Sequence, residues 1–183
     1  MAPPSRTPRT AWIDAGLRAL AAGGPDAVRV ERLAKQLGAT RGSFYWHFAD
    51  RDALLQALLE TWERRSVAEV VDHVEGRGGD ARARLRRLFA LASVDTDLLA
   101  VDLAVRDWAR RDPAVAERLR RVDNGRMAYL RELFGQFVDD PDEVEARCLV
   151  VTLVWIGDHF VVAEHGERTR AEVMERVMRG LLA

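Results

Sequence analysis

Glycine and proline divide this chain into short segments, and the apolar residues within the segments recur with the period of an α-helix. No segment alternates apolar and polar residues as a half-buried strand does. The main breakers are Gly23-Gly24-Pro25, Gly38, the stretch from Gly76 to Gly79, and the prolines at 113 and 141. The pattern predicts an all-α fold with nine helices.

Local sequence features set the expected helix limits. The first helix carries Trp12 to Leu20 and ends at Gly23, and the other eight are expected at about 30–37, 41–47, 51–74, 81–93, 96–110, 113–135, 141–165 and 170–182. Side chains that can accept a hydrogen bond from the first turn precede several of them, either alone, before a proline or in a capping box. These expected N-caps are Thr40, Asp50, Asp112, Asp140 and Thr169.

Charge is distributed unevenly along the chain. The net charge is −1 overall, but residues 1–50 hold seven basic and four acidic residues, which leaves −4 for the remainder. A basic N-terminal part on an acidic body suits a small DNA-binding head. The natural boundary is near residue 50, so we expect a DNA-binding domain at 1–50 and a separate helical body at 51–183.

The composition indicates the cellular compartment in which the protein works. Cys148 is the only cysteine, so no intrachain disulfide can form, which fits a reducing compartment. The first ten residues lack the apolar core of a signal peptide. The longest apolar run, Cys148 to Ile156, has nine residues, whereas a membrane helix needs about 18 or more. We therefore expect a cytoplasmic protein without a membrane partner.

The segment from Val30 to Leu55 has the features of a helix-turn-helix. Ala34 is small where a second helix crosses closely, and Gly38 ends the first helix in a backbone conformation that favours glycine. The expected small core of this head consists of Trp12, Leu17, Leu33, Leu37, Phe44 and Phe48.

The second short helix carries polar and amphipathic groups that can contact DNA. An arginine can bond a guanine edge bidentately in the major groove, and hydroxyl groups can bond bases or phosphates. A glycine lets the backbone approach the groove closely. Alternative interpretations place Tyr45 and Trp46 in the core and make His47 an ordinary surface residue. The candidate residues are Thr40, Arg41, Gly42, Ser43, Tyr45, Trp46 and His47.

The pattern Gly38-x2-Arg41-Gly42-x-Phe44-Tyr45-x-His47-Phe48-x2-Arg51-x2-Leu54 resembles the signature of the tetracycline-repressor-like (TetR) family. The resemblance implies a dimeric regulator, usually a repressor that small molecules release from DNA. It also implies phosphate contacts for Tyr45, His47 and Arg51, the last in place of the usual lysine. Where the family often has a capping Ser or Thr, this chain has Arg29, so a cap that contributes about 1 kcal/mol is lost. A long cation can still reach the DNA backbone, so Arg29 stays a candidate.

The resemblance also implies that 51–183 is a ligand-binding and dimerisation domain with an effector pocket within it. An aromatic-rich lining with few polar groups favours a hydrophobic or aromatic effector. Asp158 and His159 either neutralise a cationic ligand or make structural or interface hydrogen bonds. The candidate lining is Trp62, Phe89, Leu99, Leu103, Trp108, Met127, Leu130, Phe134 and Trp155.

The segment from Leu149 to Ile156 is apolar around the whole helix, so it needs cover on more than one side. A partner subunit supplies the second cover most simply. By resemblance, this helix and the amphipathic helix at 170–182 pair with their symmetry mates as a four-helix bundle. The candidate interface residues are Val150, Val154, Val161, Val173, Val177 and Leu181.

Three functions compete at this stage: a ligand-responsive DNA-binding repressor, an interaction module of the same fold without ligand response, and an enzyme. The enzyme is disfavoured because the sequence has no nucleophile–base pair and no glycine-rich phosphate loop. Glu69 and His73 are spaced to share a metal, but a solvated helix face explains them better, and no cofactor is expected. The sequence thus predicts a homodimeric, sequence-specific transcriptional regulator that binds an operator in double-stranded DNA and an unidentified small effector.

Overall fold

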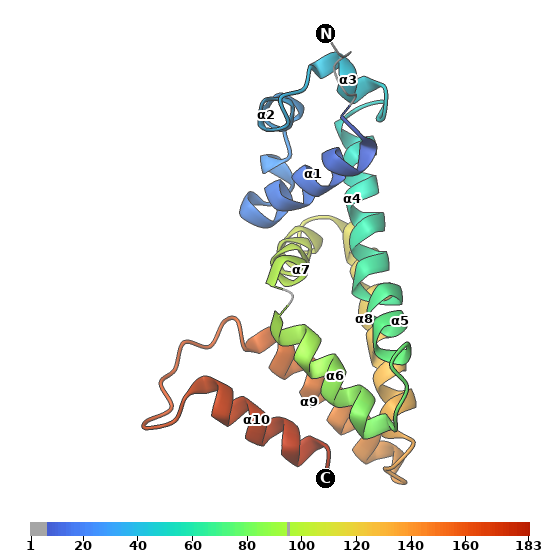
Figure 1. Cartoon of the computed structure of the whole chain (residues 1–183), viewed down its shortest axis with the longest axis vertical. Helices are drawn as coiled ribbons and strands as arrows, with labels where there is room; N and C mark the ends of the chain where they lie inside the picture. Colours follow the sequence, from blue (N-terminus) through green and yellow to red (C-terminus); the bar gives the residue numbers. More distant parts are fainter. Residues whose placement is uncertain (1–6, 95) are drawn as a thin grey trace. The chain divides into compact units, whose positions relative to one another are not determined.

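A computed structural model describes residues 7–94 and 96–183, and in these ranges the chain consists of helices and connecting segments with no strand (Figure 1). The expected nine-helix layout is confirmed, with one of the nine helices interrupted. The elements are α1 (Arg9–Gly23), the 3-10 turn η1 (Pro25–Ala27), α2 (Val30–Gln36), α3 (Arg41–Tyr45), α4 (Arg51–Ser66), α5 (Ala68–Glu75), α6 (Ala81–Val94), α7 (Thr96–Ala109), α8 (Pro113–Phe134), α9 (Pro141–Gly157) and α10 (Arg170–Leu181).

The expected N-caps form as the local sequence predicts. Each capping side chain accepts a hydrogen bond from a backbone N–H in the first turn of its helix, which satisfies a donor that has no partner inside the helix. Thr169 and Glu172 form a complete capping box at the start of α10. The capping residues are Thr40, Asp50, Asp112, Asp140 and Thr169.

The helix expected at 51–74 is interrupted at Val67, which corrects that prediction. Val67 leaves the helical region, with φ −128° and ψ −69°, and separates α4 from α5. Ser66 and Val67 both have lower helix propensity than the residues before them. Arg64 and Glu69 form an ion pair across the break, with 2.8 Å between Nε and Oε1.

The helix expected at 141–165 ends at Gly157, eight residues early. Glycine is a poor helix former, and Arg170 binds the chain where α9 ends, because it donates to the carboxylate and to the carbonyl of the C-cap residue Asp158 over 2.6 Å each. Residues 161–165 have no regular structure, so Val161 does not belong to a helical dimer face. His165, expected in the last helical turn, lies in the same irregular segment.

The chain divides into two compact units. The first comprises the described residues of 1–69 and 95–122, and so includes the head, α4, α7 and the start of α8. Its core contains Trp12, whose ring meets Phe44 edge-on at 5.3 Å between centroids. Trp12, Leu33 and Phe44 are fully buried, and Phe48 is 4% exposed. The expected head core is confirmed, although Leu37 is only partly buried.

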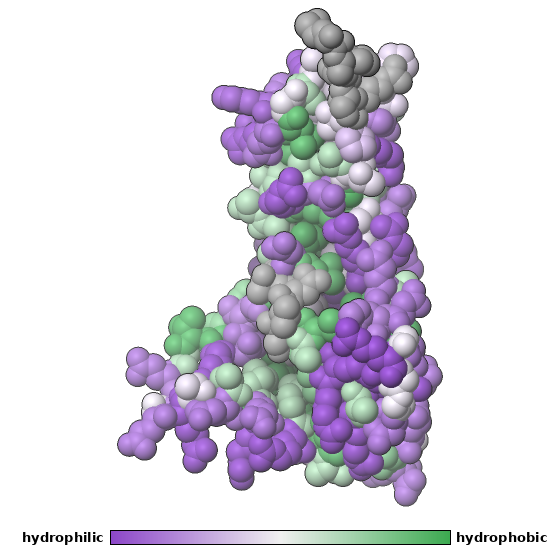
Figure 2. All heavy atoms as spheres, viewed as in Figure 1, coloured by the Kyte–Doolittle hydropathy of each residue, from purple (hydrophilic) through white to green (hydrophobic). Residues whose placement is uncertain are grey.

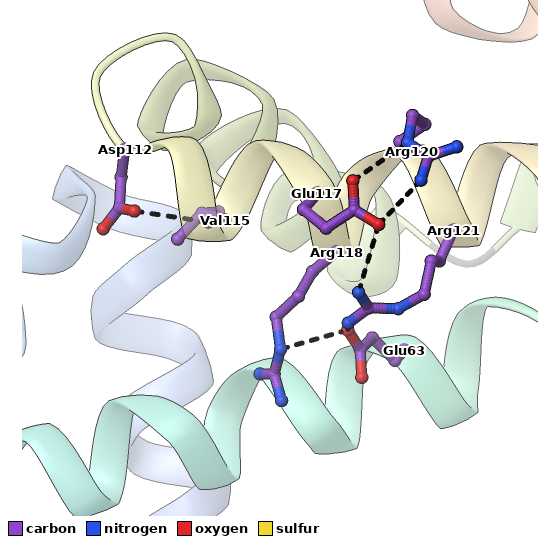
Figure 3. Close-up of polar contacts among 7 residues, drawn as sticks. All are labelled: Glu63, Asp112, Val115, Glu117, Arg118, Arg120 and Arg121. Carbon is purple, nitrogen blue, oxygen red and sulfur yellow. Dashed lines mark hydrogen bonds and ion pairs between the residues drawn. The ribbon is translucent and has the colours of Figure 1, made fainter.

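Within this first unit, ion pairs join the start of α8 to α4 (Figure 3). Glu63 of α4 lies 3.3 Å from Arg118 Nε and 3.6 Å from Arg121 Nη2. Glu117 pairs with Arg120 at 2.7 Å on the helix surface. The Glu63 pairs are the more shielded ones, because the Glu63 side chain is 26% exposed.

The second unit comprises residues 70–94 and 123–183. Leu85, Leu133, Phe134 and Cys148 are fully buried in its core. The C-terminal end of α10 is fixed by two arginines, since Arg82 donates to the carbonyl of Leu182 and Arg147 donates to that of Leu181. The functional boundary near residue 50 stays a prediction.

Among the described residues, no helix combines the length and the apolar character that crossing a membrane requires.

Candidate nucleic-acid interface

The turn between α2 and α3 has the geometry that the helix-turn-helix prediction requires. Gly38 has φ +60°, a left-handed conformation that a side chain would disfavour. Ala34 is 5% exposed, and its carbonyl accepts from the Ala39 N–H at 2.9 Å, which closes the turn. Burial of Leu33 and Phe44 then packs the two helices together.

Residues at the C-terminal end of α3 project into solvent. Tyr45 is 53% exposed and Trp46 is 74% exposed, which rules out the alternative that places them in the core. Gly42 is also exposed, and a Cβ added there would meet only Thr40 Oγ1, at an ordinary 3.7 Å. No internal contact therefore requires a glycine at 42, which is consistent with a close approach from outside. Ser43 donates two hydrogen bonds to Thr40 at the start of the helix, from its N–H to Oγ1 and from its hydroxyl to the carbonyl.

Arg41 is the first residue of α3, and its guanidinium contacts α2. Its Nη2 lies 3.1 Å from Glu31 Oε1. The neighbouring Tyr45 side chain, followed by the charge of Glu31, raises the pKa of Arg41 above its usual value. The ion pair gives this exposed cation a partner on the neighbouring helix. The sequence indicated Arg41 but not Glu31.

Arg51 has structural partners that the sequence did not reveal. Its Nε donates to the carbonyl of Val28 at 2.8 Å and its Nη2 donates to that of Pro25 at 2.5 Å. Its Nη1 lies 3.8 Å from Asp52. The guanidinium therefore ties the start of α4 to the segment before α2, and its expected phosphate contact remains a prediction for the exposed part of the group.

His47 and Arg29 also contact backbone carbonyls within the head. His47 Nε2 is 2.9 Å from the carbonyl of Thr7, so the end of α3 is in contact with the residues that precede α1. Arg29 is the N-cap of α2 and makes no capping hydrogen bond, as expected. Its Nε donates instead to the carbonyl of Asp26 at 3.2 Å, and the residue is exposed.

The candidate effector residues fall into both compact units. Those in the first unit are Trp62, Leu99, Leu103 and Trp108. Trp62 is fully buried and borders a cleft of about 310 Å³, which the other three do not line. This cleft is lined by Asp14, Leu17, Arg18 and Ala21 of α1, Trp62 and Arg65 of α4, and Asp97, Leu98, Ala100 and Val101 of α7.

The candidates in the second unit are Phe89, Met127, Leu130, Phe134 and Trp155. Leu130 and Phe134 are buried in its core. Trp155 is the distinctive member, because its indole N–H is buried and has no hydrogen-bond partner among the described residues. The guanidinium of Arg126 lies over the Trp155 ring, 4.6 Å from its centroid.

Apolar side chains of α9 are exposed to solvent. Leu149, Val150 and Leu153 are 52%, 41% and 58% exposed. Val154, Val173 and Leu181 are half-buried, and Val177 is exposed. Figure 2 shows further hydrophobic surface where the segment after α9 begins, and Phe160, Val161 and Val162 are exposed there. As an isolated chain, the protein leaves this surface uncovered.

Asp158 and His159 both have partners within the chain. Asp158 is bound by Arg170, and His159 Nδ1 lies 3.2 Å from the carbonyl of Trp155. These contacts fit the interpretation of the sequence in which Asp158 and His159 make structural hydrogen bonds. Across residues 7–94 and 96–183, no group of three or more His, Cys, Asp or Glu side chains could hold a metal ion.

Residues 13–58 match the model of the bacterial regulatory proteins, tetR family. Over the whole chain, solved structures of transcriptional regulators have the same fold. One from Rhodococcus is 22% identical, with a TM-score of 0.70, and the match covers 96% of this chain and 94% of that one. The fatty acid degradation regulator FadR from Bacillus halodurans is 20% identical, with a TM-score of 0.68 and coverages of 98% and 97%.

A transcriptional regulator from Streptomyces coelicolor is 23% identical, with a TM-score of 0.66 and coverages of 93% and 96%. No curated protein matches the chain. The class defined by fold and head is a transcriptional regulator with a DNA-binding helix-turn-helix. The match of residues 13–58 to the model of the tetR family confirms the resemblance found in the sequence.

Proposed function

We propose that this protein is a homodimeric repressor that binds a near-palindromic operator and is released from it by a small hydrophobic or aromatic effector. The observation that carries the proposal is the exposed group on α3, in which Arg41, Tyr45 and Trp46 project from a helix-turn-helix of the expected geometry. Arg41 at the start of α3 is suited to reading a base, while Tyr45, His47 and Arg51 are suited to phosphate contacts.

A dimer follows from the exposed apolar side chains of α9. Leu149, Val150 and Leu153 together form a surface that water contacts unfavourably and that a second copy of α9 could cover. A twofold dimer presents two α3 helices, which predicts half-sites about one DNA turn apart, ~34 Å, or slightly more. The residues proposed for the interface are Val150, Val154, Val173, Val177 and Leu181.

The effector is proposed to bind in the second unit, beside Trp155. Its buried indole N–H has no partner among the described residues, and a buried donor without a partner is costly unless a ligand or water accepts its hydrogen bond. The Met127 and Phe89 side chains are partly buried in the same unit. An effector with an apolar body and one acceptor atom suits these groups. Because one structure of the same fold is a fatty acid degradation regulator, acyl compounds belong in the first screen.

The decisive experiment selects bound sequences from random DNA with the full chain and footprints the best of them. Two related half-sites support the proposal, whereas no enrichment over the starting pool contradicts it. Compounds are then screened for release of that DNA, with tryptophan fluorescence as a second readout. A compound that binds tightly and changes the fluorescence but leaves DNA affinity unchanged would contradict the release mechanism. We further propose a cytoplasmic location and no enzymatic activity.

The second candidate is an interaction module of the same fold without ligand response. The contacts of Arg51 favour it in one respect, because they give this residue a role that needs no DNA. A protein that enriches no DNA sequence but forms a stable complex with another protein would support this alternative.

A further inference from the structure

We propose that Glu31 of α2 is a positioning residue, which orients the Arg41 guanidinium for base reading and so helps to set the operator preference. The inference rests on the proposed DNA-binding function. Its basis is the 3.1 Å contact between Arg41 Nη2 and Glu31 Oε1, which joins the two helices of the helix-turn-helix at its surface. Neither residue lies in the core, since the two side chains are 61% and 62% exposed.

Folding stability does not explain this ion pair. Exposed ion pairs contribute little to stability, because water screens them and two flexible side chains become ordered. A carboxylate on a DNA-facing surface also repels phosphates and so weakens binding to every sequence. The contact with Arg41 offsets this cost, because it positions the cation at the start of α3 for base reading.

The contact leaves Arg41 able to read a base. A guanidinium has five N–H donors, of which the Glu31 contact occupies part, and the rest can bond the O6 and N7 atoms of guanine. A free arginine loses much rotamer freedom when it binds. The contact with Glu31 on α2 restricts that freedom beforehand, so less is lost on binding and the guanidinium meets one base pair in one orientation.

If Glu31 positions Arg41, replacing it should change general DNA affinity and base discrimination in opposite directions. Glu31→Gln keeps the shape but removes the charge, so the affinity for random DNA should rise. Discrimination at the base pair read by Arg41 should fall by about threefold to tenfold, which is typical of coupling between residues in contact. A residue with only a structural role would not raise one quantity while lowering the other. Thermal stability should stay unchanged, because the pair is exposed.

Two further variants distinguish the effect of a negative charge near the DNA from the effect of the contact between Glu31 and Arg41. Asp52→Asn neutralises an exposed acid beside Arg51 and leaves the Glu31–Arg41 pair intact. It should raise affinity for all sequences alike, with discrimination unchanged. Glu31→Asp keeps the charge but withdraws the carboxylate by one methylene group, so discrimination should fall without the gain in general affinity.

The test is a competition assay with the DNA selected by the wild-type chain, variants of it at each position, and random DNA. It includes Arg41→Ala and the double variant Arg41→Ala/Glu31→Gln. Positioning requires that Glu31→Gln has no effect on discrimination once Arg41 is absent. If the losses of discrimination in Glu31→Gln and Arg41→Ala add in the double variant, the proposal is overturned. It is also overturned if a base preference disappears in Glu31→Gln but survives in Arg41→Ala, because Glu31 would then read the base itself.

The failure of this inference is distinct from the failure of the proposed function. If the wild-type chain enriches no DNA sequence, the proposed function fails and the inference fails with it. If the wild-type chain enriches an operator and Glu31→Gln discriminates as well as wild type, only the role of Glu31 is overturned.

Discussion

Trp62 of α4 and Asp102 of α7 are joined by a buried hydrogen bond, in which the indole Nε1 donates to Oδ1 across 3.1 Å. Both residues are fully buried. The other carboxylate oxygen of Asp102 accepts from Arg106 Nε at 2.8 Å, and the Arg106 side chain is 20% exposed. One acid thus fixes the relative position of α4 and α7 within the first unit.

Asp102→Ala should destabilise the protein by about 2–4 kcal/mol, because a buried indole N–H and a mostly buried cation both lose their acceptor. Asp102→Asn should cost less, since its amide oxygen can still accept from Trp62. Denaturant unfolding at constant pH measures both changes. The matched control is Asp107→Ala on the same helix, which breaks an exposed pair with Arg111 and should cost below about 0.5 kcal/mol. Equal losses of unfolding free energy in Asp102→Ala and Asp107→Ala would contradict the role given to the buried Asp102.

Arg51→Ala should lower both DNA affinity and the stability of the head. Its guanidinium satisfies the carbonyls of Pro25 and Val28, and the loss of hydrogen bonds from a charged donor costs about 1.5–3 kcal/mol. The sequence alone predicts mainly a loss of DNA affinity. Arg29→Ala is the control, because that exposed side chain makes a single bond to the Asp26 carbonyl. Urea unfolding and DNA titration of both variants distinguish the two roles. Wild-type stability of Arg51→Ala would show that these bonds contribute nothing.

Tyr45→Phe and His47→Ala should weaken binding to all DNA sequences by similar factors. Phosphate contacts carry no sequence information, so the selected sequence should stay the same. Removal of a charged phosphate contact reduces the dependence of log affinity on log salt concentration by about one. Tyr45→Phe should leave this dependence on salt unchanged, because it removes a hydroxyl group and no charge. A shifted sequence preference in either variant would instead assign that residue to base reading.

Replacement of Val150 with arginine should produce monomers or aggregates. The change places a charge in an exposed apolar surface that also contains Leu149 and Leu153. A charge buried against the partner without a counter-charge strongly opposes association. Light scattering of the wild type and the variant at the same concentration measures the effect. A well-folded wild-type monomer at micromolar concentration would exclude the proposed dimer.

Cys148 should be inert towards thiol reagents in the folded protein. Its side chain is fully buried, and burial raises the pKa of the thiol to about 11 from the usual 9.0. The folded state therefore holds the proton more tightly than the unfolded state does. The associated stability is present below pH 9.0 and declines as the pH rises towards 11. The rate of maleimide labelling, with and without denaturing urea, tests the prediction, and fast labelling of the native protein would contradict it.

The sequence by itself determined the local features of this protein. The caps at Thr40, Asp112 and Thr169 and the left-handed turn at Gly38 formed as expected. Each depends on a backbone group within a few residues, so the information needed to predict it lies in one short segment. The motif around Tyr45 was equally local, and it was sufficient to indicate the class of protein.

The tertiary structure decided which side chain meets a distant partner. Arg51 bonds carbonyls 23 and 26 residues away, and Trp62 bonds Asp102 across 40 residues. Backbone carbonyls are present at every residue, so composition and spacing cannot select Pro25 or Val28 as partners. Arg170 likewise binds Asp158, the C-cap of α9, from twelve residues further along the chain. Such contacts exist only after packing has brought the segments together, whereas helix periodicity and caps are properties of the segments themselves.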